Sequence, residues 1–269
     1  MPLTQSTDAA TSAKAAKKAA KPKKMAAAFF DVDNTLVRGS TTYYFARMAY
    51  TSNFFKRTEL WRFAWQQFRF IARGENAHMI SHIKDQALAL VKGRTVDEMM
   101  VLVHKIYDQE IKDRLWPETV RLAQQHIKQG REVWLITAAP QELGDEIAKN
   151  LGLTGAIGTR VEHKDGKLTG NLVGKTLHGK EKRKAIRKLA KDRNISLRKS
   201  FAYSDSHNDL PMLTAVGHAV AVNPDKLLKI YAKSASWKIY DFKKRELRRH
   251  KKAQAKKAAA KSVKISKRG

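Results

Sequence analysis

FFDVDNTLV, residues 29–37, joins an apolar run to two closely spaced acids. The run reads as a buried strand that ends by presenting the carboxylates of Asp31 and Asp33, followed by the hydroxyl of Thr35. Side chains two residues apart on a strand point to the same side, so the two acids are expected to lie together. Paired carboxylates repel each other unless a cation or a shared proton compensates. The pattern therefore favours a metal-assisted nucleophile beside an acid/base over the alternative, an Asp-rich turn.

Two further strand-like runs end at polar groups. REVWLITA, residues 131–138, ends at the hydroxyl of Thr137, and SFAYSDS, residues 200–206, ends on Asp205. Open α/β sheets bind ligands at the carboxyl ends of their strands, where such groups converge. The basic segment 179–190 lies between these two runs, and a lysine from it can reach the same point. Three separate stretches of the chain thus predict one polar site at one edge of a sheet.

These residues together resemble the four motifs of the haloacid dehalogenase superfamily of phosphohydrolases. DVDNT, residues 31–35, resembles motif one; Thr137 resembles motif two; a lysine within 180–184 resembles motif three; and SDSHND, residues 204–209, resembles motif four. The resemblance covers about residues 26 to 240. The segments SDSHNDLPML, residues 204–213, and NPD, residues 223–225, are most similar to those of the phosphoserine-phosphatase-like branch, subfamily IB. The resemblance implies an α/β fold with a Rossmann-like parallel sheet core and an inserted small helical cap.

The first motif supplies the expected catalytic residues. A carboxylate can attack phosphorus to give an aspartyl-phosphate, which splits one difficult displacement into two easier ones. Asp31 is the expected nucleophile. Asp33, two residues on, is the expected general acid/base, which protonates the leaving oxygen and then takes a proton from water. The resemblance implies the same roles for both positions.

Mg²⁺ is the expected cofactor, because it prefers hard oxygen ligands and keeps waters and substrate oxygens around it. Asp31 and Asp205 are the expected side-chain ligands, and the resemblance implies that Asp33 contributes its backbone carbonyl. Asp209 is either a third ligand or a residue that supports one. Asn208 binds either the surroundings of the ion or the substrate phosphate.

Thr137 and one lysine are expected to hold the phosphoryl oxygens as negative charge develops on them. Lys180, Lys182 and Lys184 compete for this role. Lys182 is preferred, because the resemblance implies a lysine shortly before the apolar face of its helix. His207, between the acids of the fourth motif, is expected to be a loop residue, since Mg²⁺ seldom recruits imidazole.

The predicted cap does not match phosphoserine as the substrate. The resemblance implies a glutamate for the substrate ammonium where this chain has Ser40, and a cap arginine for the substrate carboxylate where the alignment gives Asp85. A buried ammonium without its carboxylate partner loses much of its recognition. The sequence therefore predicts a phosphatase of small phosphorylated metabolites, with phosphoserine phosphatase proper as an alternative.

The rest of the chain predicts strands alternating with helices, and hence a parallel sheet with right-handed crossovers. Residues 42–115 lack a strand signal and carry apolar residues at helical spacing. Their Trp- and Phe-rich part, residues 54–71, is better explained as the core of a cap than as a membrane-surface helix. Residues 157–172 are expected to form a hairpin around Asp165-Gly166. The predicted division is a discontinuous core of residues 25–41 and 116–242, a helical cap of 42–115, and tails of 1–24 and 243–269.

Positive charge is concentrated in the two tails. The chain of 269 residues has a net charge of +29, of which the N-terminal tail supplies +5 and the C-terminal tail +12. Both tails are rich in Ala and Lys and poor in large apolar residues, so they are expected to be disordered and to contact polyanions non-specifically. The chain has no cysteine, no apolar run of membrane-spanning length and no apolar leader before Met25. We expect a cytoplasmic protein without disulfides.

Three functional hypotheses follow from these patterns. The first is a Mg²⁺-dependent phosphomonoester hydrolase. The second, from a different class, is a nucleic-acid- or anionic-surface-binding protein on a degenerate phosphatase scaffold, which the basic tails suggest and the complete set of four motifs opposes. The third is phosphoryl transfer to an acceptor other than water, which uses the same residues and is separated from hydrolysis only by its products.

Overall fold

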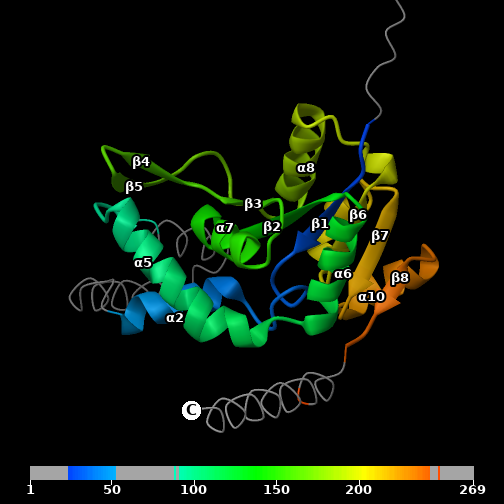
Figure 1. Ribbon diagram of the computed structural model, residues 1–269, viewed down its shortest axis with the longest axis horizontal. Coiled ribbons are helices and arrows are strands. Elements are labelled where there is room, and N and C mark those ends of the chain that lie inside the picture. The colour runs from blue at the N-terminus through cyan, green and yellow to red at the C-terminus, as the bar shows by residue number, and fades with distance from the viewer. Residues whose placement is uncertain (1–23, 53–87, 89–90, 243–247, 249–269) are drawn as a thin grey trace, which may run out of the picture.

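The computed structural model describes residues 24–52, 88, 91–242 and 248 (Figure 1). A six-stranded sheet forms its centre, in the order β3-β2-β1-β6-β7-β8, and each of its pairings is parallel. This is the doubly wound order, in which the chain leaves the middle of the sheet first to one side and then to the other. The predicted parallel α/β core is confirmed. The strands of this sheet are β1 (Ala27–Asp31), β2 (Glu132–Pro140), β3 (Gly155–Thr159), β6 (Phe201–Ser204), β7 (His218–Val222) and β8 (Lys238–Tyr240).

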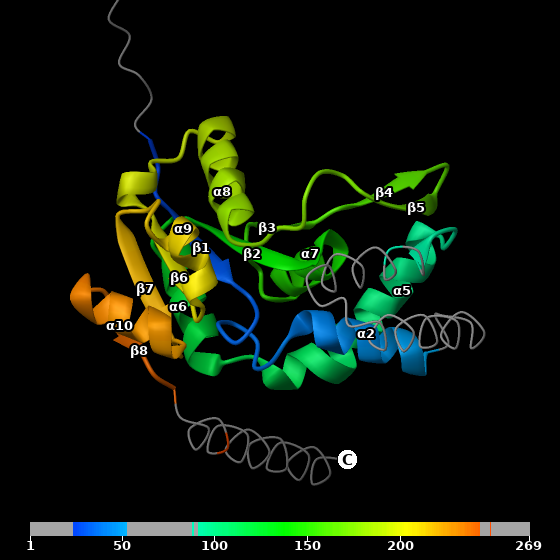
Figure 2. The same ribbon diagram turned by 180° about the vertical axis from the view of Figure 1, so that it is seen from behind.

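Helices cover both faces of this sheet, as the two opposite views show (Figures 1 and 2). One face packs against α6 (Pro117–Lys128) and α7 (Gln141–Asn150). The other face packs against α8 (Lys180–Asp192), α9 (Leu210–Leu213) and α10 (Lys226–Ser234). The short 3-10 turns Leu197–Lys199 and His207–Asp209 precede β6 and α9. The result is a three-layer α/β/α arrangement that buries the sheet on both sides.

Strand β1 shows why this sequence belongs at the centre of the sheet. All five of its residues are buried. Ala27 and Phe29 face the layer of α8 to α10, whereas Ala28 and Phe30 face the layer of α6 and α7. A strand buried on both faces is apolar throughout instead of alternating, as is typical of parallel sheets. The strand thereby delivers Asp31 to its carboxyl end from a rigid base.

A buried histidine on α6 packs against the sheet. His126 Nε2 is 2.7 Å from the hydroxyl oxygen of Tyr203, and Arg131 Nη1 is 3.1 Å from His126 Nδ1. A guanidinium only donates hydrogen bonds, so Nδ1 must accept and Nε2 must carry the proton. Burial, together with the charge of Arg131, lowers the pKa of His126 from 6.5 to about 4. The Tyr203 ring in turn stacks on Phe30 at a centroid distance of 4.1 Å.

Two features of the sheet differ from the sequence prediction. The predicted hairpin of residues 157–172 begins too early, because residues 157–159 belong to the edge strand β3. The hairpin itself consists of β4 (Val161–Lys164) and β5 (Lys167–Leu172), and its turn at Asp165-Gly166 has positive φ at both residues. The edge strand β8 was not predicted, because three residues are too few to give a periodic signal.

The described part of the predicted cap consists of two helices and their connection to the core. These elements are α2 (Thr41–Thr51), α5 (Val96–Ile106), a π-helical turn (Tyr107–Ile111) and a 3-10 turn (Lys112–Arg114). The two strands of the connection are held together, since Arg38 donates its backbone N–H to Arg114 and Trp116 donates its own to Leu36, both at 2.8 Å. The predicted helix of residues 54–71, Asp85 and nearly all of both tails lie outside the described residues. The domain boundaries stay predictions.

Within the described ranges, none of the helices combines the length and the hydropathy that crossing a bilayer requires.

Candidate active site

The predicted acids meet where the strand order of the sheet reverses. Asp31 is the last residue of β1, and Asp205 directly follows the neighbouring strand β6. They line a cavity of about 210 Å³ at the carboxyl ends of the strands, which is where open α/β sheets bind their ligands. The lining residues are Asp31, Asp33, Asn34, Ala138, His178, Lys182, Asp205, Ser206, Asn208 and Asp209.

Lys182 is the lysine that reaches this cavity. Its Nζ lies 2.5 Å from Asp31 Oδ1 and 2.7 Å from Asp209 Oδ2, and its side chain is only 5% exposed. Lys182 and Ile186 lie one turn apart on the buried face of α8, whereas Lys180 and Lys184 are exposed. Of the three lysines that the sequence left in competition, the structure therefore brings only Lys182 to the acids. Its role toward a phosphate stays a prediction.

Burial dominates the electrostatics of the cluster. It raises the pKa of Asp31 to about 8, although the neighbouring Lys182 lowers it. Burial and the charge of Asp209 likewise raise the pKa of Asp205 to about 7. For Lys182, burial disfavours the ammonium, but the carboxylates of Asp31 and Asp209 outweigh this and raise its pKa. The single ammonium of Lys182 therefore does not return the pKa values of Asp31 and Asp205 to their ordinary range.

A divalent cation fits part of this donor set. Among the described residues, no three His, Cys, Asp or Glu side chains are arranged to hold a metal ion together. Asp209 Oδ2 accepts from Lys182 at 2.7 Å and from Ser204 Oγ at 2.8 Å, and Asp31 Oδ1 also accepts from Lys182, at 2.5 Å. Asp31 and Asp205 both line the cavity, and burial is the main cause that raises their pKa values. Mg²⁺ is commonly held by one or two carboxylates with the rest of its ligands from water and substrate, so this pair suits it.

Asp33 is held by the first turn of the cap. Its Oδ1 accepts from Thr41 N at 2.9 Å and from Thr41 Oγ1 at 2.5 Å, and its Oδ2 accepts from Ser40 Oγ at 3.1 Å. Ser40 is also the N-cap of α2. The loop between them is a tight turn, in which Asn34 has a positive φ of 53° and its Oδ1 accepts from Gly39 N at 3.0 Å. The expected acid/base therefore lies at the junction of core and cap.

The side chain of Thr137 does not line the cavity. It is buried within β2, which extends to Pro140, past the end at Ala138 that the sequence predicted. The hydroxyl oxygen accepts from Ala139 N at 3.1 Å, while the neighbouring Ala138 lines the cavity. The predicted contact between Thr137 and a phosphate stays a prediction. Asn208, by contrast, lies in the lining beside Asp209.

The sequence analysis missed His178 as a lining residue. His178 stands at the end of the loop before α8, and the following Gly179 adopts a positive φ of 53°. A Cβ on Gly179 would lie 3.5 Å from the backbone oxygen of Asn208, so the loop runs close to the fourth motif. A His-Gly pair directly before the basic helix was the available signal. His207 is not among the lining residues, and its Nδ1 lies 2.9 Å from Asp225 Oδ2.

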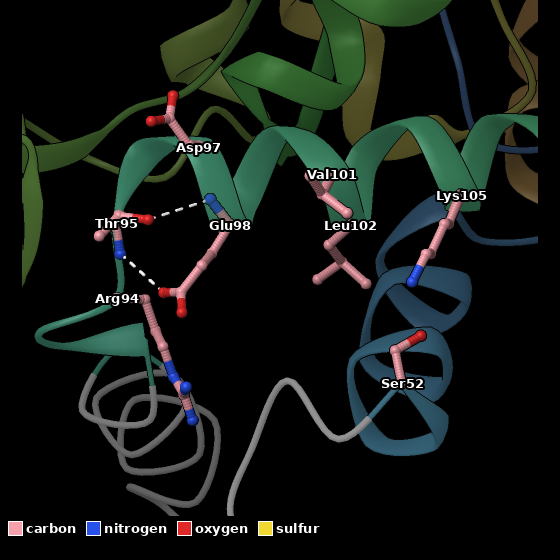
Figure 3. A pocket seen from close by; sticks show the side chains of 8 residues that line it. All are labelled: Ser52, Arg94, Thr95, Asp97, Glu98, Val101, Leu102 and Lys105. Atoms are coloured by element: carbon pink, nitrogen blue, oxygen red, sulfur yellow. Dashed lines mark hydrogen bonds between the residues drawn. The ribbon is translucent and has the colours of Figure 1, made fainter.

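A larger cavity, of about 380 Å³, lies away from these acids, between α5 and the end of α2 (Figure 3). Figure 3 shows Val101, Leu102 and Lys105 along the helix that borders it. At the start of α5, Thr95 and Glu98 form a reciprocal capping box. The polar groups at this end stabilise a helix terminus and do not form a reactive cluster, so chemistry is assigned to the smaller cavity.

The chain is similar to known proteins in sequence and in structure. The family model for haloacid dehalogenase-like hydrolases matches residues 28–214. A Mycobacterium tuberculosis protein named phosphoserine phosphatase is 47% identical over 219 residues, which cover 81% of this chain and 71% of that protein. A structure from Bordetella pertussis Tohama I, of unknown function, has a TM-score of 0.70 at 25% identity and covers 81% of this chain and 99% of that one. A substrate-bound phosphoserine phosphatase shares the fold, with a TM-score of 0.56 at 22% identity over 85% of this chain and 99% of that one.

Proposed function

This chain belongs to the haloacid dehalogenase-like hydrolase family and is a phosphatase of that family, and we propose that it hydrolyses small phosphomonoesters through an aspartyl-phosphate with the help of Mg²⁺. One observation carries the proposal. Asp31, Asp205 and Asp209 come together at the ends of β1 and β6, and the buried Lys182 bonds to Asp31 and Asp209. A nucleophilic carboxylate beside a fixed cation at the mouth of a parallel sheet is suited to phosphoryl transfer.

The reaction proceeds in two displacements on phosphorus. In the first, a carboxylate oxygen of Asp31 forms a bond to phosphorus while the bond to the ester oxygen breaks, and Asp33 gives its proton to the departing alcohol. In the second, a water oxygen attacks the same phosphorus, Asp33 takes the water proton, and the bond to Asp31 breaks. The products are the alcohol and inorganic phosphate, and both aspartates return to their starting states.

Hydrogen-bonding and charged side chains hold the reacting groups in position. Thr35 donates a hydrogen bond to Asp31 Oδ2 at 3.1 Å and lies 3.4 Å from Asp205 Oδ1, so its hydroxyl orients both acids. Lys182, Asn208 and Thr137 are the proposed partners of the phosphoryl oxygens. Asp31 and Asp205, with the backbone carbonyl of Asp33, would hold Mg²⁺, and Asp209 supports the site through Lys182. When bound, the ion neutralises charge on the acids and on the phosphoryl group.

The substrate is proposed to be a small phosphorylated metabolite. A cavity of about 210 Å³ is smaller than most ligand pockets and suits a phosphoryl group with little else. Phosphoserine is favoured by the name of the mycobacterial relative and opposed by Ser40, whose hydroxyl bonds to Asp33 and offers no carboxylate to an ammonium. We therefore expect phosphoserine to be a poor substrate.

A metabolite screen tests this proposal. Inorganic phosphate released from a broad panel of phosphomonoesters, including phosphoserine, is measured with Mg²⁺ and with chelator. Transfer to an added alcohol is followed in parallel, because it separates hydrolysis from phosphotransfer. The absence of turnover on the whole panel would contradict a phosphomonoesterase, and a first rank for phosphoserine by kcat/KM would restore the alternative substrate.

The tails are proposed to contact polyanions and to leave the chemistry unchanged. Residues 1–24 and 243–269 carry +17 of the net charge of +29, and phosphate contacts of this kind weaken steeply with salt. A protein truncated at both tails should keep its kcat on a small ester and lose most of its retention on heparin. Equal retention of both proteins would place the binding surface on the folded body. The cytoplasmic location stays a prediction.

A further inference from the structure

The outward side of α10 combines large apolar side chains with lysines. Leu227, Ile230 and Tyr231 are 59%, 65% and 42% exposed, and they lie three and four residues apart, so they adjoin on the helix. Lys226 and Lys233 are exposed on the same helix. These five residues are called the α10 face. Apolar groups of this size gathered on a surface helix mark an interaction site more often than isolated ones do.

The helix is held on the sheet mainly by its opposite side. The opposite side of α10 packs through Leu228 and Ala232, both fully buried, against the layer that also contains α8 and α9. A helix anchored in this way would normally carry polar residues on its outer side. Leu227 and Ile230 are therefore not part of this buried packing, whereas the Tyr231 ring contacts that of Trp237 at a centroid distance of 5.1 Å.

The charge of the face is positive and largely uncompensated. The helix KLLKIYAKS contains three lysines and no acid. Lys226 and Lys233 form no ion pair with any other described residue, whereas Lys229 pairs with Asp241 at 2.9 Å. The nearby Asp225 is engaged as well, since it caps the helix through Leu228 N at 2.7 Å. Negative charge on a partner would thus meet free lysines.

The C-terminal segment adds to this charge. Strand β8 follows α10 directly and lies next to β7 in the sheet, and Figure 1 shows β8 and α10 side by side. Residues 243–269, which begin two residues after Asp241, carry thirteen Lys and Arg and a single acid. In the sequence, the most basic stretch of the chain therefore begins three residues after the end of β8.

We propose that the α10 face docks on an anionic membrane surface. A helix that presents lysines beside Leu, Ile and Tyr lies at the boundary of headgroups and acyl chains, where the apolar groups insert and the lysines meet anionic lipids. A nucleic acid would satisfy the lysines and leave Leu227 and Ile230 in water. A second copy of the chain would bring like charges together. Of these three partners, an anionic lipid surface alone matches both components of the face.

Vesicle sedimentation with the full-length protein tests the proposal. Wild-type protein should bind vesicles that contain phosphatidylglycerol and should not bind vesicles of pure phosphatidylcholine. Leu227→Ser with Ile230→Ser should weaken binding to the anionic vesicles by roughly tenfold or more, because inserted apolar area is lost. Lys226→Gln with Lys233→Gln should weaken it as well, and raised salt should remove the difference between this variant and the wild type.

Matched controls separate this face from the tails. Val101→Ser with Val173→Ser removes two exposed apolar side chains elsewhere and should bind like the wild type. Turnover of a small soluble aryl phosphate should be unchanged in every variant, which verifies the fold and is independent of docking. Equal vesicle binding by the wild type and the Leu227/Ile230 variant would refute the proposal. A parallel loss of retention on DNA by that variant would refute it too, because the face would then serve nucleic acid.

Discussion

Replacing Lys182 with methionine tests the centre of the proposed site. The ammonium bonds to two carboxylates, Asp31 at 2.5 Å and Asp209 at 2.7 Å, and the side chain is 5% exposed. Methionine keeps most of the volume, so the substitution mainly removes the charge. Removing one partner of a buried ion pair costs about 3–5 kcal/mol, because a charge is left without compensation. For a chain of this size that corresponds to a fall in Tm of roughly 6–20 °C.

The loss of activity should be larger than the loss of stability can explain. Lys182 is the described cation nearest to the proposed nucleophile, and removal of one group that stabilises developing charge lowers kcat by about 10²–10³. Lys184→Met is the matched control, since Lys184 lies two residues away, pairs with Glu181 and has a side chain that is 68% exposed. That variant should keep its activity and stay within about 0.5 kcal/mol of the wild type.

The measurement combines thermal melting in chelator with turnover of an aryl phosphate in Mg²⁺, for both variants. The destabilisation of Lys182→Met should be largest above about pH 8 and should shrink as the pH falls through that value, because protonation of Asp31 removes charge that the lysine compensates. The reasoning would be refuted by an active, stable Lys182→Met protein, or by an inactive but folded Lys184→Met protein.

Three further outcomes are expected. Asp31→Asn should abolish turnover and leave a folded protein of equal or higher Tm, since burial opposes the ionisation of this proposed nucleophile and Lys182 keeps its ion pair with Asp209 in the variant; turnover by the folded variant would exclude the covalent mechanism. Chelator should stop turnover and added Mg²⁺ should restore it and raise Tm, with both effects weakened in Asp205→Ala; full activity in chelator would mean that the acids hold no metal. Lowering the pH from about 7.5 to 5 should reduce the free energy of unfolding of the wild type by about 2 kcal/mol more than that of His126→Gln. The reason is that the histidine binds a proton near pH 6.5 in the unfolded chain and only near pH 4 in the folded one. Equal pH profiles of the two proteins would show that His126 titrates normally.

Some site residues could be identified from the sequence because their position follows from local rules. Asp31 and Asp205 each stand at the end of a short apolar run, and parallel strands bring such ends to one edge of a sheet. The choice of Lys182 was an inference from the resemblance, and the structure places that lysine at the acids through the helical spacing to Ile186. His178 could not be found in this way, because a loop residue carries no periodic signal.

The sequence by itself determined the fold class, the family and which polar residues follow each central strand, because buried strands and their terminal residues are fixed by local composition. Only the tertiary structure decided which groups share hydrogen bonds. It joined Asp209 to Lys182 and Ser204, and it tied Asp33 to the first turn of α2 through Ser40 and Thr41. These hydrogen bonds depend on how separate helices and strands pack against each other. The sequence around one partner therefore does not show where the other partner lies. The exposure of the α10 face was likewise set by packing, since Leu227 and Leu228 differ only in which side of one helix the sheet covers.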